Sequence, residues 1–76
     1  MEKYDKELDA RRLSCPLPIL RTKKSLADMT SGQILKILAT DTGAVQDMQA
    51  FARQTGNTLL SHGEADGELI FFMQKK

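Results

Sequence analysis

The sequence predicts an α+β fold: a two-layer α/β sandwich with two helices on one face of a four-stranded mixed sheet. Four short segments carry strand-like apolar patterns and two longer segments carry helical ones, in the order β-α-β-α-β-β. An Asp66-Gly67 pair between the last two strand patterns indicates a tight hairpin, because both central residues of the favoured turn need positive φ. With 76 residues, the chain has room for a single domain, residues 1–76.

The first two strands are predicted at residues 6–10 and 34–39. Residues 6–10 alternate weakly, with Leu8 and Ala10 on one face. Residues 34–39 are almost continuously apolar, which is typical of an interior strand. The length of the connection favours a parallel pair with a right-handed helical crossover.

A helix is predicted between these strands. Pro16 and Pro18 fix its start at residues 16–18, because proline is tolerated in the first helical turn and disfavoured in the interior. It is expected to run to about Met29, before the sequence Thr30-Ser31-Gly32. The predicted inward face comprises Ile19, Leu20, Leu26, Ala27 and Met29, and the outward face Arg21, Lys24 and Asp28.

The second half of the chain predicts a helix followed by a hairpin. Residues 41–43 form a turn with an N-cap candidate, and Gly56 ends the helix. Residues 58–62 and 69–73 are predicted strands. The apolar stripe of the second helix comprises Ala44, Met48, Phe51 and Ala52.

Composition indicates a soluble globular protein held by ordinary packing. The chain is 41% hydrophobic and 28% charged, with one Cys and one His. One cysteine cannot form an internal disulfide, and this pair is too small for a structural zinc site, so no metal is expected. The residues from Met1 to Asp5 lack an apolar signal region, and no apolar run approaches a membrane span. We therefore expect a cytoplasmic protein with no membrane association.

Positive charge gathers in one segment of the chain. Residues 10–27 contain five basic residues and no acidic one, and Cys15 lies among them. One interpretation is a set of ordinary solvated charges; the other is a positive rim that lowers the pKa of the Cys15 thiol and attracts an acidic partner or a phosphate backbone. The basic residues are Arg11, Arg12, Arg21, Lys23 and Lys24.

Cys15 is the candidate reactive residue. It precedes the first predicted helical turn, where backbone N–H groups and the helix dipole would depress the pKa of the thiol. A dithiol oxidoreductase needs a second cysteine, which the chain lacks. A cysteine hydrolase needs a general base, and the sequence does not place His62, the single histidine, near Cys15. An exposed histidine on a strand face is the favoured interpretation of His62, with a general base as the alternative. One accessible thiol suffices to accept sulfur as a persulfide. The alternative is a buried cysteine that serves as a small hydrophobic residue.

A wider pattern surrounds Cys15-Pro16-Leu17-Pro18 and extends over nearly the whole chain. It includes Leu8-Asp9, Leu13-Ser14, the run Thr22-Lys23-Lys24-Ser25-Leu26, Met29, Gly32, Ala39-Thr40-Asp41, Asp47, Phe51, Gly56 and a final strand that ends in lysine. This pattern resembles the TusA/SirA-like sulfur-carrier family, whose Cys-Pro-x-Pro motif stands where a strand leads through a loop into a helix.

The resemblance implies a fold similar to the C-terminal domain of initiation factor three. It implies that Cys15, flanked by Pro16 and Pro18, accepts sulfane sulfur as a covalent persulfide, with no other cofactor. The donor would be a cysteine desulfurase or a rhodanese. The acceptor would be a relay that leads to 2-thiouridine in tRNA, or a DsrE-type carrier in dissimilatory sulfur oxidation. Such a carrier is substrate and catalyst in turn, and it would be a transferase if classed as an enzyme.

The sequence departs from the family pattern near the cysteine. Arg12 stands where relatives usually have glycine, and Asp41-Thr42 stands where many have Asp-Pro. Leu17 and Ser14 replace an acidic residue and an arginine of the tRNA-thiolation carriers. These differences favour the sulfur-oxidation branch.

Arg21, Lys23 and Lys24 are expected to dock an acidic partner surface, with plain solubility as the alternative. A different class of function is a non-catalytic module that uses residues 11–24 to bind RNA or an acidic regulator. No aromatic residue lies in that segment to stack on bases, so no direct nucleic-acid contact is expected. A third hypothesis is a redox sensor that forms sulfenic acid at Cys15.

Overall fold

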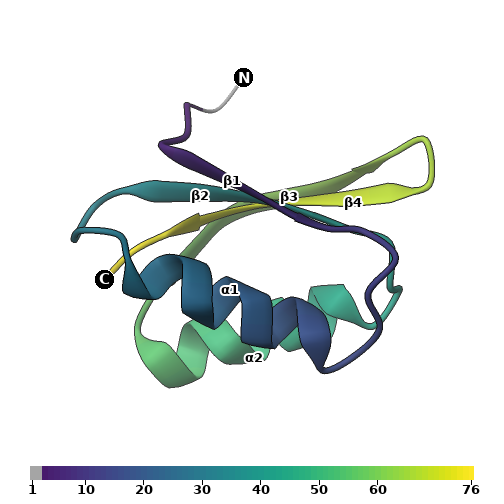
Figure 1. Ribbon diagram of the computed structural model, residues 1–76, viewed down its shortest axis with the longest axis horizontal. Helices are drawn as coiled ribbons and strands as arrows, with labels where there is room; N and C mark the ends of the chain where they lie inside the picture. The colour runs from purple at the N-terminus through teal and green to yellow at the C-terminus, as the bar shows by residue number, and fades with distance from the viewer. Residues whose placement is uncertain (1–2) are drawn as a thin grey trace.

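Two helices lie against one face of a four-stranded sheet in the computed structural model, which describes residues 3–76 (Figure 1). This is the predicted fold class and element order. The expectation for the start of the chain rests partly on Met1 and Glu2, which lie outside the described residues. The elements are β1 (Lys6–Ala10), α1 (Leu17–Ala27), β2 (Ile34–Ala39), α2 (Ala44–Thr55), β3 (Thr58–Ala65) and β4 (Glu68–Gln74).

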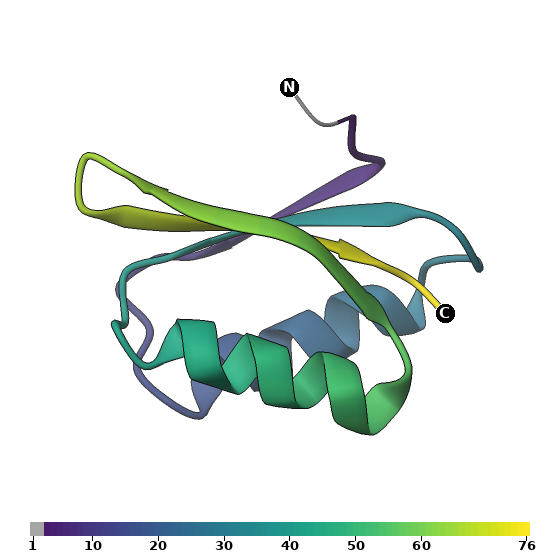
Figure 2. The same ribbon diagram turned by 180° about the vertical axis from the view of Figure 1, so that it is seen from behind.

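The strand order is β1-β2-β4-β3, with β1 and β2 parallel and the other neighbours antiparallel. The register of the parallel pair runs from Lys6 opposite Leu35 to Ala10 opposite Ala39. Each of these two strands leads into a helix, so the starts of α1 and α2 lie at the same end of the sheet. Figures 1 and 2 show both helices on the same side of the sheet and running alongside each other.

The core lies between the sheet and the helices. Strand β2 shows the alternation expected of a sheet with one covered face: Leu35, Ile37 and Ala39 are buried, and the residues between them are half-buried on the open face. The other buried hydrophobic residues are Ala10, Leu26, Met29, Ala44, Met48, Phe51, Phe71 and Met73.

Helix α1 is shorter than predicted and turned differently. It ends at Ala27, and Met29 lies beyond it with its N–H donating to the Leu26 carbonyl. The prediction that Leu20 and Ala27 face inward is wrong, since both are exposed. The buried residues of α1 are Pro18, Thr22 and Leu26.

Burial of Thr22 explains the different orientation of α1. Its hydroxyl donates to the Pro18 carbonyl at 2.8 Å, so the polar group is satisfied within the helix itself. Positions four residues apart share one helix face, and Pro18, Thr22 and Leu26 therefore form the line that contacts the core. The spacing of apolar residues did not predict this buried line, because threonine and proline are not counted as apolar core residues.

The second half of the chain follows its predicted pattern closely. Helix α2 buries Ala44, Met48 and Phe51 and ends at Gly56, whose φ of 83° is left-handed. The hairpin turn has positive φ at both predicted positions. Both hairpin strands extend beyond the predicted limits, and a bulge in β3 lies between Leu59 and Ser61. Across residues 3–76, neither helix has the length and apolar character needed to cross a membrane.

Candidate functional site

Cys15 is exposed in the loop between β1 and α1. Its backbone N–H donates to Asp41 Oδ2 at 2.9 Å. Asp41 lies in the loop between β2 and α2, and its other oxygen, Oδ1, accepts from the Gly43 N–H at 3.1 Å. One carboxylate thus ties together the two loops from which the helices start.

The start of α1 offers few N–H groups to an anion. Pro16 is the N-cap residue and Pro18 lies in the first turn, so neither carries an N–H. The Leu17 N–H donates to the Ser14 carbonyl at 2.9 Å. These losses remove most of the donors with which a helix N-terminus usually stabilises a negative charge.

The prediction of a depressed thiol pKa is wrong. Asp47, in the first turn of α2, raises the pKa of Cys15 above its ordinary value, first through a hydrogen bond with the thiol. Some loss of hydration at the thiol, the charge of Asp47 and the charge of Asp41 act in the same direction. The charged groups that act on the thiol are therefore acidic, and they favour its protonated form.

A shallow cavity opens beside Cys15 between the two helices. Its volume is about 230 Å³. Ile19 and Pro16 form its wall on the α1 side, while Asp47 and Phe51 belong to α2. The cavity thus places apolar side chains from both helices and one carboxylate beside Cys15.

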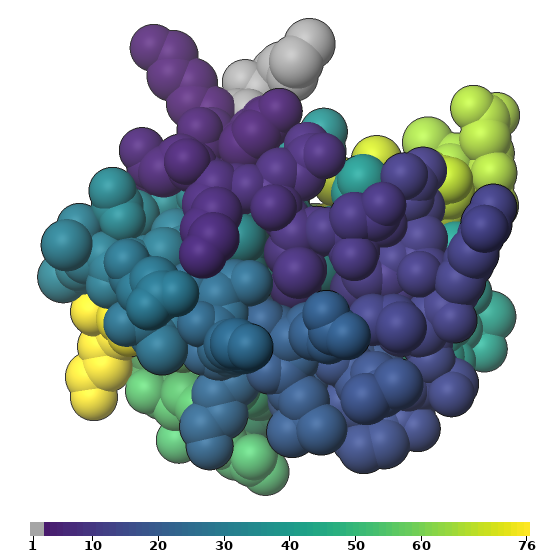
Figure 3. All heavy atoms as spheres, viewed as in Figure 1, coloured from purple at the N-terminus to yellow at the C-terminus, as the bar shows by residue number. Residues whose placement is uncertain are grey.

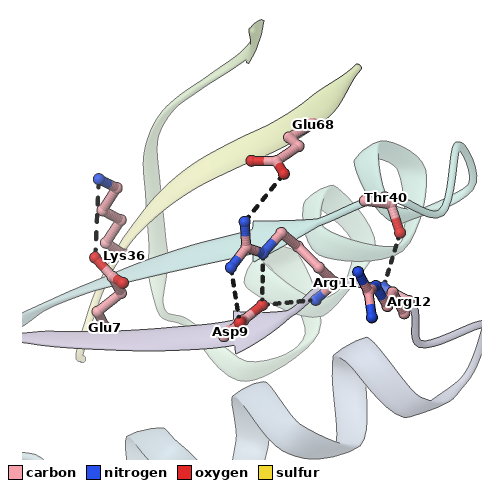
Figure 4. A network of polar contacts seen from close by, with 7 residues as sticks. All are labelled: Glu7, Asp9, Arg11, Arg12, Lys36, Thr40 and Glu68. Atoms are coloured by element: carbon pink, nitrogen blue, oxygen red, sulfur yellow. Dashed lines mark hydrogen bonds and ion pairs between the residues drawn. The ribbon is translucent and has the colours of Figure 1, made fainter. Parts of the chain in front are cut away.

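None of the five basic residues of the predicted rim lines the cavity at Cys15. Arg11 is paired with Asp9 at 2.9 Å and with Glu68 at 3.0 Å, as Figure 4 shows. This pairing lowers the pKa of Asp9 to about 2 and raises that of Arg11. The Arg12 N–H donates to Thr40 Oγ1 at 2.9 Å. Arg11 is thereby committed to a network at the end of the sheet.

Arg12 has a φ of 68°, in the left-handed region that favours glycine. A glycine would adopt this conformation without the steric cost that a Cβ atom adds. Here the same turn forms with an arginine, and the Thr40 hydroxyl accepts its N–H.

Arg21, Lys23 and Lys24 are exposed on α1, and Lys23 lines a second cavity. This second cavity, of about 440 Å³, lies at the far end of the helices and also contacts Lys75 and Lys76. Lys23 therefore lines the same cavity as the last two residues of the chain. In Figure 3, the green atoms near the end of α2 and the yellow C-terminal atoms emerge beside the blue atoms of α1.

His62 lies on β3, with its ring 6.0 Å from that of Phe71, and it is not among the residues that line the cavity at Cys15. Within the described range 3–76, no group of three or more His, Cys, Asp or Glu side chains is placed to hold a metal ion.

Sequence reasoning missed Asp41 and Asp47 as members of the site. The signal was present in the predicted topology, because two parallel neighbouring strands place the helices that follow them at the same end of the sheet. Charges counted along residues 10–27 could not reveal this, since both carboxylates lie later in the chain.

Comparisons with known proteins agree with this architecture. A family model described as Sulfurtransferase TusA matches residues 6–75. A sulfur carrier protein TusA from Allochromatium vinosum is 53% identical over 75 residues, which cover 99% of each chain. A putative sulfur carrier protein from Neisseria meningitidis is 54% identical over 69 residues, covering 91% of this chain and 93% of the relative. The crystal structure of a SirA-like protein from Desulfitobacterium hafniense superposes with a TM-score of 0.82 at 26% identity, covering 92% and 96% of the two chains.

Proposed function

The chain belongs to the TusA family of sulfur carriers, and from this premise we propose that Cys15 holds sulfane sulfur as a persulfide and relays it between proteins. The observation that carries the proposal is the position of Cys15, an exposed thiol on a loop directly before α1. It is also the single cysteine of the chain, so no other side chain here offers a thiol.

Each transfer is an exchange at sulfur. The Cys15 thiol loses its proton, and the thiolate attacks the outer sulfur of a donor cysteine persulfide. A new S–S bond forms at Cys15 while the S–S bond of the donor breaks, and the donor cysteine leaves as a thiolate that takes up a proton. In the second exchange, an acceptor thiolate attacks the outer sulfur on Cys15, which leaves in turn. No external oxidant or reductant is consumed.

The partners follow from this chemistry. The donor is a persulfidated protein, for which a cysteine desulfurase or a rhodanese is suited. For the acceptor we favour a DsrE-type carrier of sulfur oxidation over a relay to tRNA 2-thiouridine. Ser14 and Leu17 support this choice, since both are exposed beside Cys15 and so belong to the surface that an acceptor meets.

We assign Arg21, Lys23 and Lys24 to the docking of an acidic partner surface. All three are exposed on α1, the helix that follows Cys15. Reversal of Lys23 and Lys24 to Glu is expected to slow transfer to a partner protein while loading from thiosulfate or polysulfide continues. Unchanged transfer to the partner would remove this role from the two lysines.

The other two hypotheses have less support. A redox sensor needs a thiolate that reacts readily with peroxide, whereas Asp47 raises the pKa of Cys15. A nucleic-acid module would use the basic segment 11–24, in which Arg11 is already bound to two carboxylates.

Mass spectrometry tests the central proposal. Incubation with polysulfide or a persulfidated donor should add one sulfur atom, about 32 Da, and a reductant should remove it. The Cys15→Ser variant should gain nothing. A mass gain in Cys15→Ser, or none in the unaltered chain with any donor class, would contradict the proposal.

A further inference from the structure

Two neighbouring cavities lie between α1 and α2 on the helix layer, and the two together are called the groove below. The first contains Cys15, Ile19 and Asp47, and the second contains Lys23 and Lys75. Phe51 lines both cavities, so they adjoin on either side of its side chain. The helices α1 and α2 start at the same end of the sheet and run alongside each other (Figures 1 and 2). The residues that line the groove therefore follow both helices from Cys15 towards Lys75 and Lys76.

The two ends of this groove carry opposite charge. Asp47 stands beside Cys15 at one end, with Asp41 behind it, bound to the Cys15 N–H. Lys23, Lys75 and Lys76 stand at the other end, and none of them takes part in an ion pair within residues 3–76. Ile19, Leu26 and Phe51 provide an apolar floor between the ends.

The length of the groove limits the size of the peptide segment that it can bind. Helix α1 has 11 residues, which correspond to about 16 Å along its axis. An extended peptide advances about 3.3 Å per residue, so roughly five residues span this length. A short extended segment matches these dimensions.

We infer that the groove binds an extended segment of a partner protein that carries a reactive cysteine next to a basic residue and acidic residues about four positions away. The basic residue faces Asp47, the partner cysteine faces Cys15, and the acidic residues reach Lys23, Lys75 and Lys76. The opposite charges at the two ends fix which end of the segment lies at the thiol. This inference rests on the proposed function, because it specifies the partner of the same cysteine.

This arrangement also supplies a role for Asp47. Its carboxylate favours the protonated thiol while the groove is empty. A cation brought by the partner segment neutralises Asp47, which promotes the thiolate when the partner sulfur is within reach. Reactivity at Cys15 is then coupled to occupancy of the groove by the correct partner.

Two isomeric peptides test the inference. The matching peptide is acetyl-Lys-Lys-Cys-Ser-Ala-Ser-Glu-Glu-amide, and the exchanged peptide is acetyl-Glu-Glu-Cys-Ser-Ala-Ser-Lys-Lys-amide, each also made in the reverse chain direction. Each cysteine carries thionitrobenzoate as a mixed disulfide. Attack by the Cys15 thiolate forms a Cys15–peptide disulfide and releases coloured thionitrobenzoate, so the rate reports docking and needs no sulfane sulfur. The rate of each peptide with the protein is divided by the rate of the same peptide with free N-acetylcysteine as the attacking thiol. This quotient corrects for differences in the intrinsic reactivity of the peptides.

In at least one chain direction, the matching peptide should react with Cys15 roughly five- to tenfold faster than its exchanged isomer at low salt, and high salt should reduce this ratio. A triple variant should react with the two isomeric peptides at equal rates. It carries the changes Lys23→Glu, Lys75→Glu and Lys76→Glu. The single variant Lys23→Glu should reduce the ratio, and Arg53→Glu, which changes the charge by the same amount, is its matched control, because Arg53 is exposed on α2 and lines neither cavity. Arg53→Glu should leave the ratio unchanged.

Equal rates for the isomeric peptides on the unaltered chain would overturn the inference without recourse to any variant. A ratio that survives lysine reversal, or that Arg53→Glu removes equally, would also overturn it. A chain that discriminates between the peptides but never gains a sulfur atom would contradict the proposed function and leave the groove assignment standing.

Discussion

The two helices start side by side, but their first turns differ in what they offer an anion. Helix α1 begins with Pro16 and Pro18, has no acidic residue in its first turn, and commits its Leu17 N–H to the Ser14 carbonyl. Helix α2 begins after Gly43 and carries Asp47 in its first turn. The first start offers few free N–H donors, and the second carries a negative charge.

The comparison teaches that the electrostatics of Cys15 come from the neighbouring helix and not from the helix it precedes. Pro16 and Pro18 weaken the stabilisation that α1 would give a thiolate. Asp47 then raises the pKa of Cys15 from across the groove. A cysteine before a helix is therefore not by itself an activated nucleophile.

Removal of the link between the two starts should have the largest effect on stability. Asp41→Ala deletes the acceptor for the Cys15 and Gly43 N–H groups. We expect the free energy of unfolding to fall by about 1–3 kcal/mol, since both bonds are made to a charged acceptor. Urea denaturation measures this loss, and Thr42→Ala, an exposed neighbour, serves as the control. Equal stability of the two variants would show that Asp41 does not hold the loops together.

Neutralisation of Asp47 should reverse the upward shift of the Cys15 pKa. In Asp47→Asn the pKa of Cys15 should fall, because the strongest cause of its upward shift is gone, and iodoacetamide should react severalfold faster at neutral pH. Stability at neutral pH should fall by only about 0.3–1 kcal/mol, from the lost charge at the start of α2. An unchanged alkylation profile would exclude Asp47 as the controlling group.

The same raised pKa predicts a pH dependence of stability. The folded chain holds the Cys15 proton more tightly than the unfolded chain does, so its contribution is fully present below the ordinary cysteine pKa. It is lost as the pH rises through the folded pKa. Urea midpoints measured across the alkaline range should therefore fall more steeply for the unaltered chain than for Asp47→Asn, and parallel curves would contradict this.

Restoration of an N–H group to α1 should have the smallest effect on the thiol. Pro18→Ala returns one donor to the first turn, so the pKa of Cys15 should move down, by less than in Asp47→Asn. The chain should lose about 1 kcal/mol, because Pro18 is buried and preorganises the first turn. Titration of the Cys15 thiol in Pro18→Ala and in Asp47→Asn measures which substitution lowers its pKa more. A larger shift in Pro18→Ala would reverse the ranking of the two helix starts.

Most of the fold could be predicted because its signals are local. The positive φ at Asp66 and at Gly67, the left-handed Gly56 and the apolar run of β2 each act within a few residues. The orientation of α1 could not be predicted from apolar spacing, since its core line includes Thr22, whose hydroxyl is satisfied within the helix.

The site was only partly predictable, because it depends on contacts between segments that lie far apart in the sequence. The sequence places Cys15 at a loop before a helix, and the structure has it there. The acidic groups that act on it come from the next loop and helix, Asp41 and Asp47, and reach it only through the parallel pairing of β1 and β2. Charge density along the chain pointed instead to Arg11, which pairs with Asp9 and Glu68.

The bulge between Leu59 and Ser61 has a consequence for how the protein behaves at high concentration. It interrupts the regular pairing of β3, an outer strand of the sheet, and Figure 2 shows this strand curving towards the end of α2. An irregular, bent edge is a poor template for a strand from another molecule. Growth of the sheet from copy to copy, a common route to aggregates, is thereby discouraged at this edge.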